Sequence, residues 1–550
     1  MVSWWQRRGV PVKKKCSGLL ALILVICLIF SGCALDFAGY FRQVGDLLLG
    51  GSMTHFQDME YVRPDLQQLQ DTVDACCEKV KTARNLDAVV SIIYEAYEPL
   101  DQFSTAYALS NIYYSKDLTN AYWAEEYAFC SENMVIVQAA LDQFYRALAK
   151  CKFRKQLEGE NYFGPGFFAD YEGEGVYDEI FTDLLSQEAA LESQYYALWN
   201  AAGDLDIYSQ AFFENYGLQM EELYLQLIEV RQKIAAHLGY ASYPEFAYDF
   251  YYGRDYSCQQ TTSYLADIRA ELAPLYQQVI ANPPDLQLDY STEAETLGYV
   301  REMAQSMGGS IWQAYQTMVD YGLYDIAYGP NKYNASFEIY IRNYHAPYLF
   351  INPTGTEYDK LTMAHEFGHF CCDFVTGGSG AGVDVGEIFS QGMEYLSLCY
   401  TQGDEKLEQV KMISCLSILV EQAAYASFEQ QVYSLKGADL TVENVRKLYQ
   451  QTAGAYGMEI GGLDVRSYVH VNHFYTNPMY VISYVVSNDV ALQLYQMEKE
   501  QAGSGVAALT NAFQSTDTGI VTFTENYDLE SPFAVGRIKR IRQTLLQILN

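Results

Sequence analysis

The sequence predicts a mainly α-helical protein of two or more lobes with one small β-region. Apolar residues recur at spacings of three and four through most of residues 65–203, which is typical of amphipathic helices. Only residues 334–352 break this pattern clearly, with alternating and then continuous apolar residues that indicate short strands. The length of 550 residues exceeds what a single core usually accommodates, so we expect more than one lobe.

The first lobe is predicted to span residues 61–202. Leu66, Leu69, Val73 and Val80 form one apolar stripe, and similar stripes run through 86–113 and 125–155. Residues 157–175 contain five glycines and a proline, which predicts a loop.

The second lobe is predicted to span residues 203–550. It begins with a long helix over residues 220–238 that Gly239 closes, because glycine accepts the left-handed conformation of a helix end. The β-region follows at 334–352, and Asp359 is the expected N-cap of the next helix.

The N-terminus is typical of an export signal. Basic residues precede the apolar run GLLALILVICLIF, and the sequence then continues FSGCA, which resembles a bacterial lipobox. We therefore expect residues 1–32 to be a lipoprotein signal peptide, Cys33 to carry the lipid, and residues 33–60 to be a tether. An uncleaved membrane anchor is the alternative. Both interpretations place the remainder of the chain outside the cytoplasm, and the first attaches it to the bacterial cell membrane through lipid.

Composition excludes some classes of function. The formal charge of -34 disfavours nucleic-acid binding, which requires a basic surface. Twelve cysteines are present, but their spacing matches neither a disulfide framework nor a zinc ribbon. Most are expected to be buried as small apolar residues.

The stretch MAHEFGHFCCDF contains an H-E-x-x-H motif. On a helix, His365 and His369 project from one face about 6 Å apart along the axis, so both imidazoles can bind one metal ion. Glu366, beside the first histidine, is placed to act as general base toward a water on that metal. The motif therefore predicts a metal centre with one ligand still to be found.

The adjacent cysteines do not supply that ligand. Cys372 would lie about 7.5 Å along the axis from a metal held between the histidines, beyond the reach of its thiolate. Metzincins use a glycine and a third histidine at this point, but this sequence has Cys372 and Val375 there. The better candidate is Glu387, on a helix predicted after the loop 376–382, which would complete a His₂Glu site. Glu394, on the same face, is expected to orient a histidine.

At this point the chain resembles the thimet oligopeptidase and oligopeptidase F family of zinc metallopeptidases. The stretch YLFINPTGTEYDKLTMAHEFGHFC is similar to the family's strand, loop and zinc helix, and EIFSQGMEYL to its glutamate helix. Residues 233–257 and the closing SPFAVGRIKRIRQTLLQIL are also similar. The resemblance implies two helical lobes flanking a deep substrate channel, one Zn²⁺ per chain, and short unstructured peptides as substrates.

The family also places a histidine and tyrosines near the C-terminus, where they contact substrate and stabilise the oxyanion. The stretch HVNHFYTNPMYVISY resembles this region. We expect His473, Tyr480 and Tyr484 to have that role, since an imidazole and phenols can donate hydrogen bonds to an oxyanion. Ile482 stands where the family often has a further tyrosine.

The sequence therefore predicts a zinc-dependent oligoendopeptidase, anchored by lipid outside the cell, in which a water activated by the metal hydrolyses short peptides. A gluzincin-type aminopeptidase is one alternative, although its usual exopeptidase motif is absent. A lipoprotein that captures peptides without cleaving them is the other. Retention of Glu366 favours the enzyme, because capture requires no general base.

Overall fold

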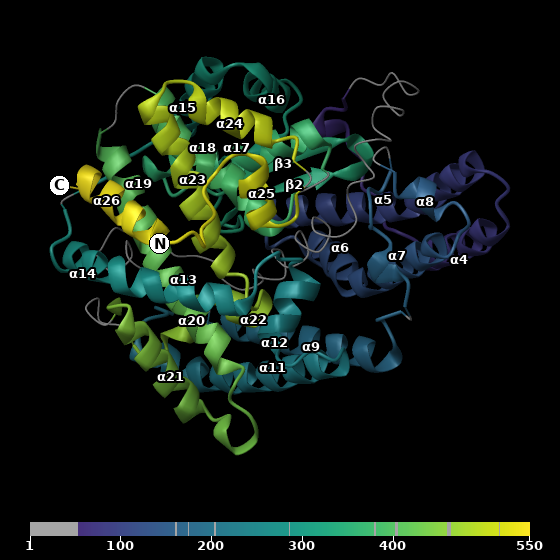
Figure 1. Ribbon diagram of the computed structural model, residues 1–550, viewed down its shortest axis with the longest axis horizontal. Helices are drawn as coiled ribbons and strands as arrows, with labels where there is room; N and C mark the ends of the chain where they lie inside the picture. Colours follow the sequence, from purple (N-terminus) through teal and green to yellow (C-terminus); the bar gives the residue numbers. More distant parts are fainter. Residues whose placement is uncertain are drawn as a thin grey trace.

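The computed structural model describes residues 53–159, 162–173, 175–202, 205–284, 286–378, 381–401, 405–458, 464–515 and 517–549. Three groups of helices are visible in Figure 1, with a small sheet between two of them. The predicted signal peptide, Cys33 and most of the predicted tether lie outside the described residues. The mainly α architecture with a small β-region is as the sequence predicted.

The N-terminal group of helices is seen at the right of Figure 1. Its longest members begin at polar caps, as at Asp65, whose side chain accepts a hydrogen bond from the Gln68 amide at 3.0 Å. The helix α4 packs against α5 and α7. The bounds are α4 (Leu66–Thr82), α5 (Leu86–Lys116), α6 (Ala121–Glu132), α7 (Met134–Ala149) and α8 (Arg154–Leu157).

The second group lies lower in Figure 1 and is built around α9 and α11, which pack together. Gly239 follows α11 with a φ of 83°, which confirms it as the glycine that closes this helix. Because α9 precedes residue 203 and α11 follows it, the predicted boundary runs between two packed helices, and the domain division stays a prediction. The bounds are α9 (Glu179–Ala202), α10 (Gln210–Phe212), α11 (Leu218–His237), α12 (Tyr243–Phe246), α13 (Cys258–Glu271), α14 (Ala273–Ala281), α20 (Ala423–Val432), α21 (Val442–Ala455) and α22 (Asn472–Thr476).

The third group, at the upper left of Figure 1, contains the H-E-x-x-H helix α17. The helix α18 packs against both α17 and α23 and is almost wholly buried. The bounds are α15 (Glu293–Met307), α16 (Gly309–Asp320), α17 (Tyr358–Thr376), α18 (Val383–Tyr400), α19 (Glu405–Ser417), α23 (Ile482–Glu500), α24 (Ser504–Ala512), α25 (Ile520–Asn526) and α26 (Arg537–Leu549).

The sheet supports α17. Its strands are β1 (Tyr324–Asp325), β2 (Ser336–Ile341) and β3 (Ala346–Ile351), in the order β1-β3-β2. The central strand β3 is parallel to β1, antiparallel to β2, and buried along its whole length. The two longer strands coincide with the predicted β-region, whereas β1, at two residues, is too short to produce a periodic pattern.

Asp359 differs from its expected role as N-cap. The helix α17 begins at Tyr358 after Glu357, so Asp359 lies in the first turn. Its carboxylate instead accepts hydrogen bonds from the amides of Thr354, Gly355 and Thr356, at 2.7–3.2 Å. Asp359 therefore holds the loop that leads from β3 into the helix.

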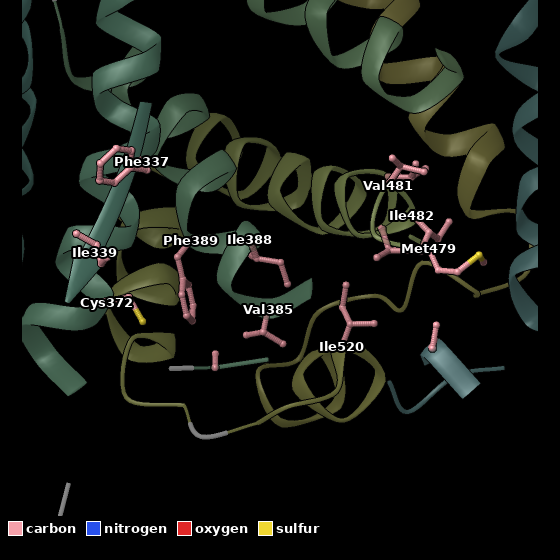
Figure 2. Packing of buried hydrophobic residues seen from close by; sticks show 14 of the residues in the cluster. Phe337, Ile339, Cys372, Val385, Ile388, Phe389, Met479, Val481, Ile482 and Ile520 are labelled. Carbon is pink, nitrogen blue, oxygen red and sulfur yellow. The ribbon is translucent and has the colours of Figure 1, made fainter. Parts of the chain in front are cut away.

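The core around α18 joins distant parts of the chain. Val385, Ile388 and Phe389 of α18 share one cluster with Ile520 and with the residues around Met479 (Figure 2). This packing places the first turns of α18 beside the segment that precedes α23.

None of the described helices combines the length and the apolar character that a membrane-spanning helix requires.

Candidate metal centre

Three ligand atoms converge between α17 and α18. The Nε2 atoms of His365 and His369 lie 3.6 and 4.0 Å from Oε2 of Glu387. In the described part of the chain these residues form the one group whose ligand atoms all lie within 4.8 Å of one another. Two ligands bonded to one tetrahedral zinc ion would be about 3.3 Å apart, so the distances from Glu387 to the two histidines are within about 1 Å of those of a zinc site.

Gly368 allows the two helices to approach this closely. A Cβ at this position would lie 2.5 Å from the carbonyl oxygen of Phe389 and 2.7 Å from Cα of Ser390. Backbone atoms cannot yield as a flexible side chain can, so any larger residue would separate α17 from α18. The glycine within H-E-F-G-H therefore determines how near Glu387 comes to the histidines.

Glu394 orients His365. Its Oε1 lies 2.8 Å from Nδ1 of His365, and its Oε2 accepts a hydrogen bond from Nζ of Lys411, also at 2.8 Å. A hydrogen bond from Nδ1–H leaves Nε2 of the histidine available as a metal ligand. Burial opposes the charged imidazole, but the carboxylates of Glu394, Glu366 and Glu387 raise the pKa of His365 to about 9.

His369 is in a different electrostatic state. Burial lowers its pKa to about 4, and the nearby His365 adds to this effect, while Glu387 opposes it. His369 is therefore neutral at physiological pH and needs to lose no proton to bind a metal.

Glu366 lies beside the ligands and is only 5% exposed. Burial raises the pKa of its carboxyl to about 7, against the lowering effects of His365 and of a hydrogen bond with Ser336. A carboxylate that titrates near neutral pH can both accept and return a proton, which is what a general base in hydrolysis must do.

The C-terminal candidates also reach this centre. The Tyr480 hydroxyl donates to Oε1 of Glu387 at 2.9 Å, and the Tyr484 hydroxyl lies 3.3 Å from Nε2 of His473. The rings of His473 and Tyr480 stack with their centroids 5.3 Å apart. Because the Tyr480 hydroxyl is bonded to a metal-ligand candidate, its role toward an oxyanion stays a prediction.

Other histidines have different surroundings. The ring of His470 is buried among Trp199, Tyr208, Phe212 and Phe213, and burial lowers its pKa to about 4. His345 ends the turn between β2 and β3 with a φ of 47°.

None of the described cysteines belongs to the group of candidate metal ligands. Cys372 is buried, and this burial raises the pKa of its thiol. All nine described cysteines are free, and six of them are buried.

No role was predicted from the sequence for Lys411 or for Ser390, which was expected only to share a helix face with Glu387 and Glu394. Lys411 is fully buried on α19, and its partner Glu394 is on α18. Ser390 Oγ lies 3.0 Å from Oε2 of Glu387 and 3.1 Å from the Glu387 carbonyl oxygen, so its single hydrogen serves one of them. The only sequence signal for Lys411 is a lysine within the apolar run VKMISCL, and such a signal does not name a partner.

Comparisons with known proteins concern the family and the fold of this chain. Residues 56–174 match the family model of the Peptidase M3 N-terminal domain. No curated protein matches the chain. A solved structure assigned as an oligoendopeptidase F shares 22% identity at a TM-score of 0.79, over 90% of this chain and 98% of the other.

Two further structures are similar over the same extent. PZ peptidase A, solved with an inhibitor, shares 21% identity at a TM-score of 0.79, over 90% of this chain and 99% of its own. A protein from Bacillus anthracis assigned as an oligoendopeptidase F shares 22% identity at a TM-score of 0.77, over 91% of this chain and 98% of its own. The N-terminal domain match and the shared fold together confirm the resemblance to the oligopeptidase F family of M3 peptidases that the sequence motifs indicated.

Proposed function

We propose that this protein is a zinc-dependent oligoendopeptidase. The observation that carries the proposal is the convergence of His365, His369 and Glu387, with Glu366 buried beside them. Two imidazoles and one carboxylate form a ligand set that zinc favours, and they leave a coordination position open. When bound, zinc supplies Lewis acidity that polarises the peptide carbonyl and lowers the pKa of water.

The protein's own side chains supply the proton transfers, the orientation of a ligand and the contacts to the oxyanion. Glu366 removes the proton from the attacking water and delivers it to the leaving amine. Glu394 and Lys411 hold His365 in the orientation that points its Nε2 at the site. We assign Tyr484 and His473 the contacts to the oxyanion. The support is that both rings pack against Tyr480, whose hydroxyl is bonded to Glu387.

The choice of substrate rests on the family resemblance. Oligoendopeptidases cleave within short peptides, so a blocked N-terminus should not prevent cleavage. An aminopeptidase, the alternative, requires a free substrate amine. A capture protein would bind peptides without cleaving them.

The test compares wild-type full-length protein with Glu366→Gln on internally quenched peptides, with and without blocked N-termini. We expect hydrolysis of both peptide sets by the wild type, its loss on chelation, and a decrease of about 10²–10⁴-fold in the variant. Glu302→Gln, an exposed carboxyl on α15, is the matched control and should retain full activity.

Zinc content separates the possible causes of lost activity. Glu366→Gln should retain its zinc, because Glu366 is not a ligand. If the wild type binds zinc and peptides but releases no fluorescence, the enzyme proposal is wrong and peptide capture replaces it.

We also propose that the protein is a lipoprotein held outside the cytoplasm. The support is the signal-like N-terminus and the lipobox ending at Cys33. Wild-type protein in a bacterial host should incorporate labelled palmitate, and Cys33→Ala should not. Equal labelling of the two would contradict the lipid assignment.

A further inference from the structure

Tyr480 follows a residue with an unusual backbone conformation. Between α22 and α23 the chain is irregular, and Met479 has a φ of 66°, in the left-handed region. A residue with a Cβ is rarely found there, and surrounding contacts must hold it in place. The direction in which Tyr480 leaves the backbone depends on this conformation.

Two buried ionisable side chains hold the backbone of Met479 from both sides. Oε1 of Glu429, on α20, accepts a hydrogen bond from the Met479 amide at 2.8 Å. Nη1 of Arg254, in the turn before α13, donates to the Met479 carbonyl oxygen at 3.0 Å. Glu429 is 0% exposed and Arg254 8%. We call these two residues the Met479 anchors.

Arg254 and Glu429 do not form an ion pair with each other. Among the ion pairs of the described residues, none joins Arg254 to Glu429. The backbone amide and carbonyl of Met479 are therefore direct partners of two desolvated side chains. The hydrogen bond from the Arg254 guanidinium is charge-assisted, which makes it stronger than one between neutral partners.

Arg254 also contacts the helix that carries Glu387. Its Nε lies 3.5 Å from Oδ2 of Asp384, three residues before Glu387 on α18, and its Nη2 donates to Oγ of Ser483 at 2.8 Å. One guanidinium thus contacts both segments that meet at the Tyr480–Glu387 hydrogen bond. Figure 2 shows apolar residues around this junction: Met479, Val481 and Ile482 lie together, and Ile520 lies between them and the labelled residues of α18.

The hydrogen bond from Tyr480 gives the two oxygens of Glu387 different roles. Oε1 accepts the Tyr480 hydroxyl, and Oε2 faces His365 and His369. A donor on one oxygen fixes the rotation of the carboxylate and directs the other oxygen to the metal.

We propose that Arg254 and Glu429 are positioning residues that hold Met479 in its left-handed conformation and so place the Tyr480 hydroxyl on Glu387. The inference rests on the proposed function in taking Glu387 as a metal ligand. The anchors act through Tyr480 and touch neither substrate nor metal.

The test is a double-mutant cycle on zinc affinity in full-length protein, measured by competition with a chromophoric chelator. Glu429→Met and Tyr480→Phe should each raise the zinc dissociation constant by about tenfold. The double variant should bind zinc no more weakly than the single variant with the lower zinc affinity, because Glu429 has no effect on Glu387 once the Tyr480 hydroxyl is gone. Additive losses would show that Glu429 acts on the fold in general and would overturn the proposal.

Two controls separate positioning from general stability. Glu429→Gln keeps an oxygen that can accept from the Met479 amide, so its zinc dissociation constant should stay within about twofold of the wild-type value. Arg537→Met removes a guanidinium that is 4% exposed and bonded to Asp489, away from Met479, and should leave zinc affinity unchanged. If Arg537→Met weakens zinc as much as Glu429→Met does, the proposal is wrong.

If Glu429→Met does not fold, Arg254→Lys replaces it in the cycle. Lysine keeps the charge but cannot reach the Met479 carbonyl and Ser483 together. The expected result is a several-fold loss of zinc affinity that disappears in the Tyr480→Phe background, and an undiminished loss there overturns the proposal.

Peptide hydrolysis, measured separately, distinguishes the two proposals. If the wild type hydrolyses peptides but the effects of Glu429→Met and Tyr480→Phe on zinc affinity are not coupled, the proposed function stands and this inference is wrong. If the effects on zinc affinity are coupled but no peptide is hydrolysed, the inference stands and the proposed function is wrong.

Discussion

The hydroxyl of Tyr480 donates a 2.9 Å hydrogen bond to Oε1 of Glu387, although 93 positions separate the two residues. Burial and the Glu387 carboxylate both raise the pKa of Tyr480, so the phenol keeps its proton and remains a donor. Tyr484, in the first turn of α23, contacts His473 instead. The two tyrosines are therefore predicted to affect different properties of the protein.

Tyr484→Phe should leave zinc affinity within about twofold of wild type and lower kcat by about 10²-fold, because it removes an oxyanion contact without touching a ligand. Steady-state kinetics together with chelator competition check this. Tyr480→Phe is the comparison, since it should weaken zinc binding. Full kcat in Tyr484→Phe would exclude Tyr484 as an oxyanion donor.

Gly368→Ala should reduce stability by about 1–3 kcal/mol and also weaken zinc binding, because the new methyl group would push α17 away from α18. Urea unfolding and zinc titration measure the two effects. Gly298→Ala is the matched control, because a Cβ added to this helical glycine of α15 would meet no atom within 4 Å. That variant should gain up to about 1 kcal/mol from helix propensity. Equal changes in stability and zinc affinity in Gly368→Ala and Gly298→Ala would contradict the close approach of α17 and α18 at Gly368.

Lys411→Met should destabilise the fold by about 3–5 kcal/mol, since it removes the buried ammonium group that donates to Oε2 of Glu394 and leaves only His365 beside that carboxylate. Adding Glu394→Gln should recover most of this loss, because the neutral amide oxygen can still accept from His365 and no uncompensated charge remains. Urea unfolding of both single variants and the double variant is the measurement. A double variant as unstable as Lys411→Met would mean that Lys411 acts by packing alone.

Stability should depend on pH through Glu429. Burial raises the pKa of this carboxyl to about 8, against the lowering effects of the Met479 amide, Arg231 and Arg254. A raised carboxyl pKa means that the folded state holds the proton more tightly. The contribution of protonated Glu429 to the free energy of unfolding is full below the unfolded-state pKa of about 4.5, and it falls as the pH rises toward 8.

Between pH 5 and 8, therefore, the wild type should lose stability relative to Glu429→Gln, which has no proton to release. The loss should approach about 1.4 kcal/mol per pH unit near pH 6–7 and lessen toward either end of this range. Melting temperatures of both proteins across this range give the comparison, in which shared titrations cancel. A difference that stays constant with pH would show that Glu429 is already ionised in the folded protein.

Local patterns predicted the helices and the zinc-helix motif because their information lies within a few residues. His365 and His369 share a face through the geometry of one helix, and Gly239 ends its helix through its own backbone freedom. The expected N-cap role of Asp359 was wrong, because Asp at a helix start can serve either as a cap or as an acceptor for the preceding loop. The choice depends on the path that leads from β3.

The candidate site was only partly predictable. Glu387 and Glu394 could be named because they share a face of a helix close in sequence to the motif. Lys411, Arg254 and Glu429 could not be named, because a buried ionisable side chain carries no local sign of its partner.

By itself, the sequence determined that the chain is mainly helical, that a metal-binding pair of histidines shares one helix face, and that an acid lies next to the first histidine. Each of these follows from the 3.6-residue repeat of an α-helix and from the chemistry of single side chains. Only the tertiary structure decided that Oε2 of Glu387 faces the histidines while Oε1 receives Tyr480, and that Arg254 and Glu429 hold the backbone between the two segments. These contacts join residues far apart in the chain, and they exist because helix packing, which includes the close contact at Gly368, brings the helices together.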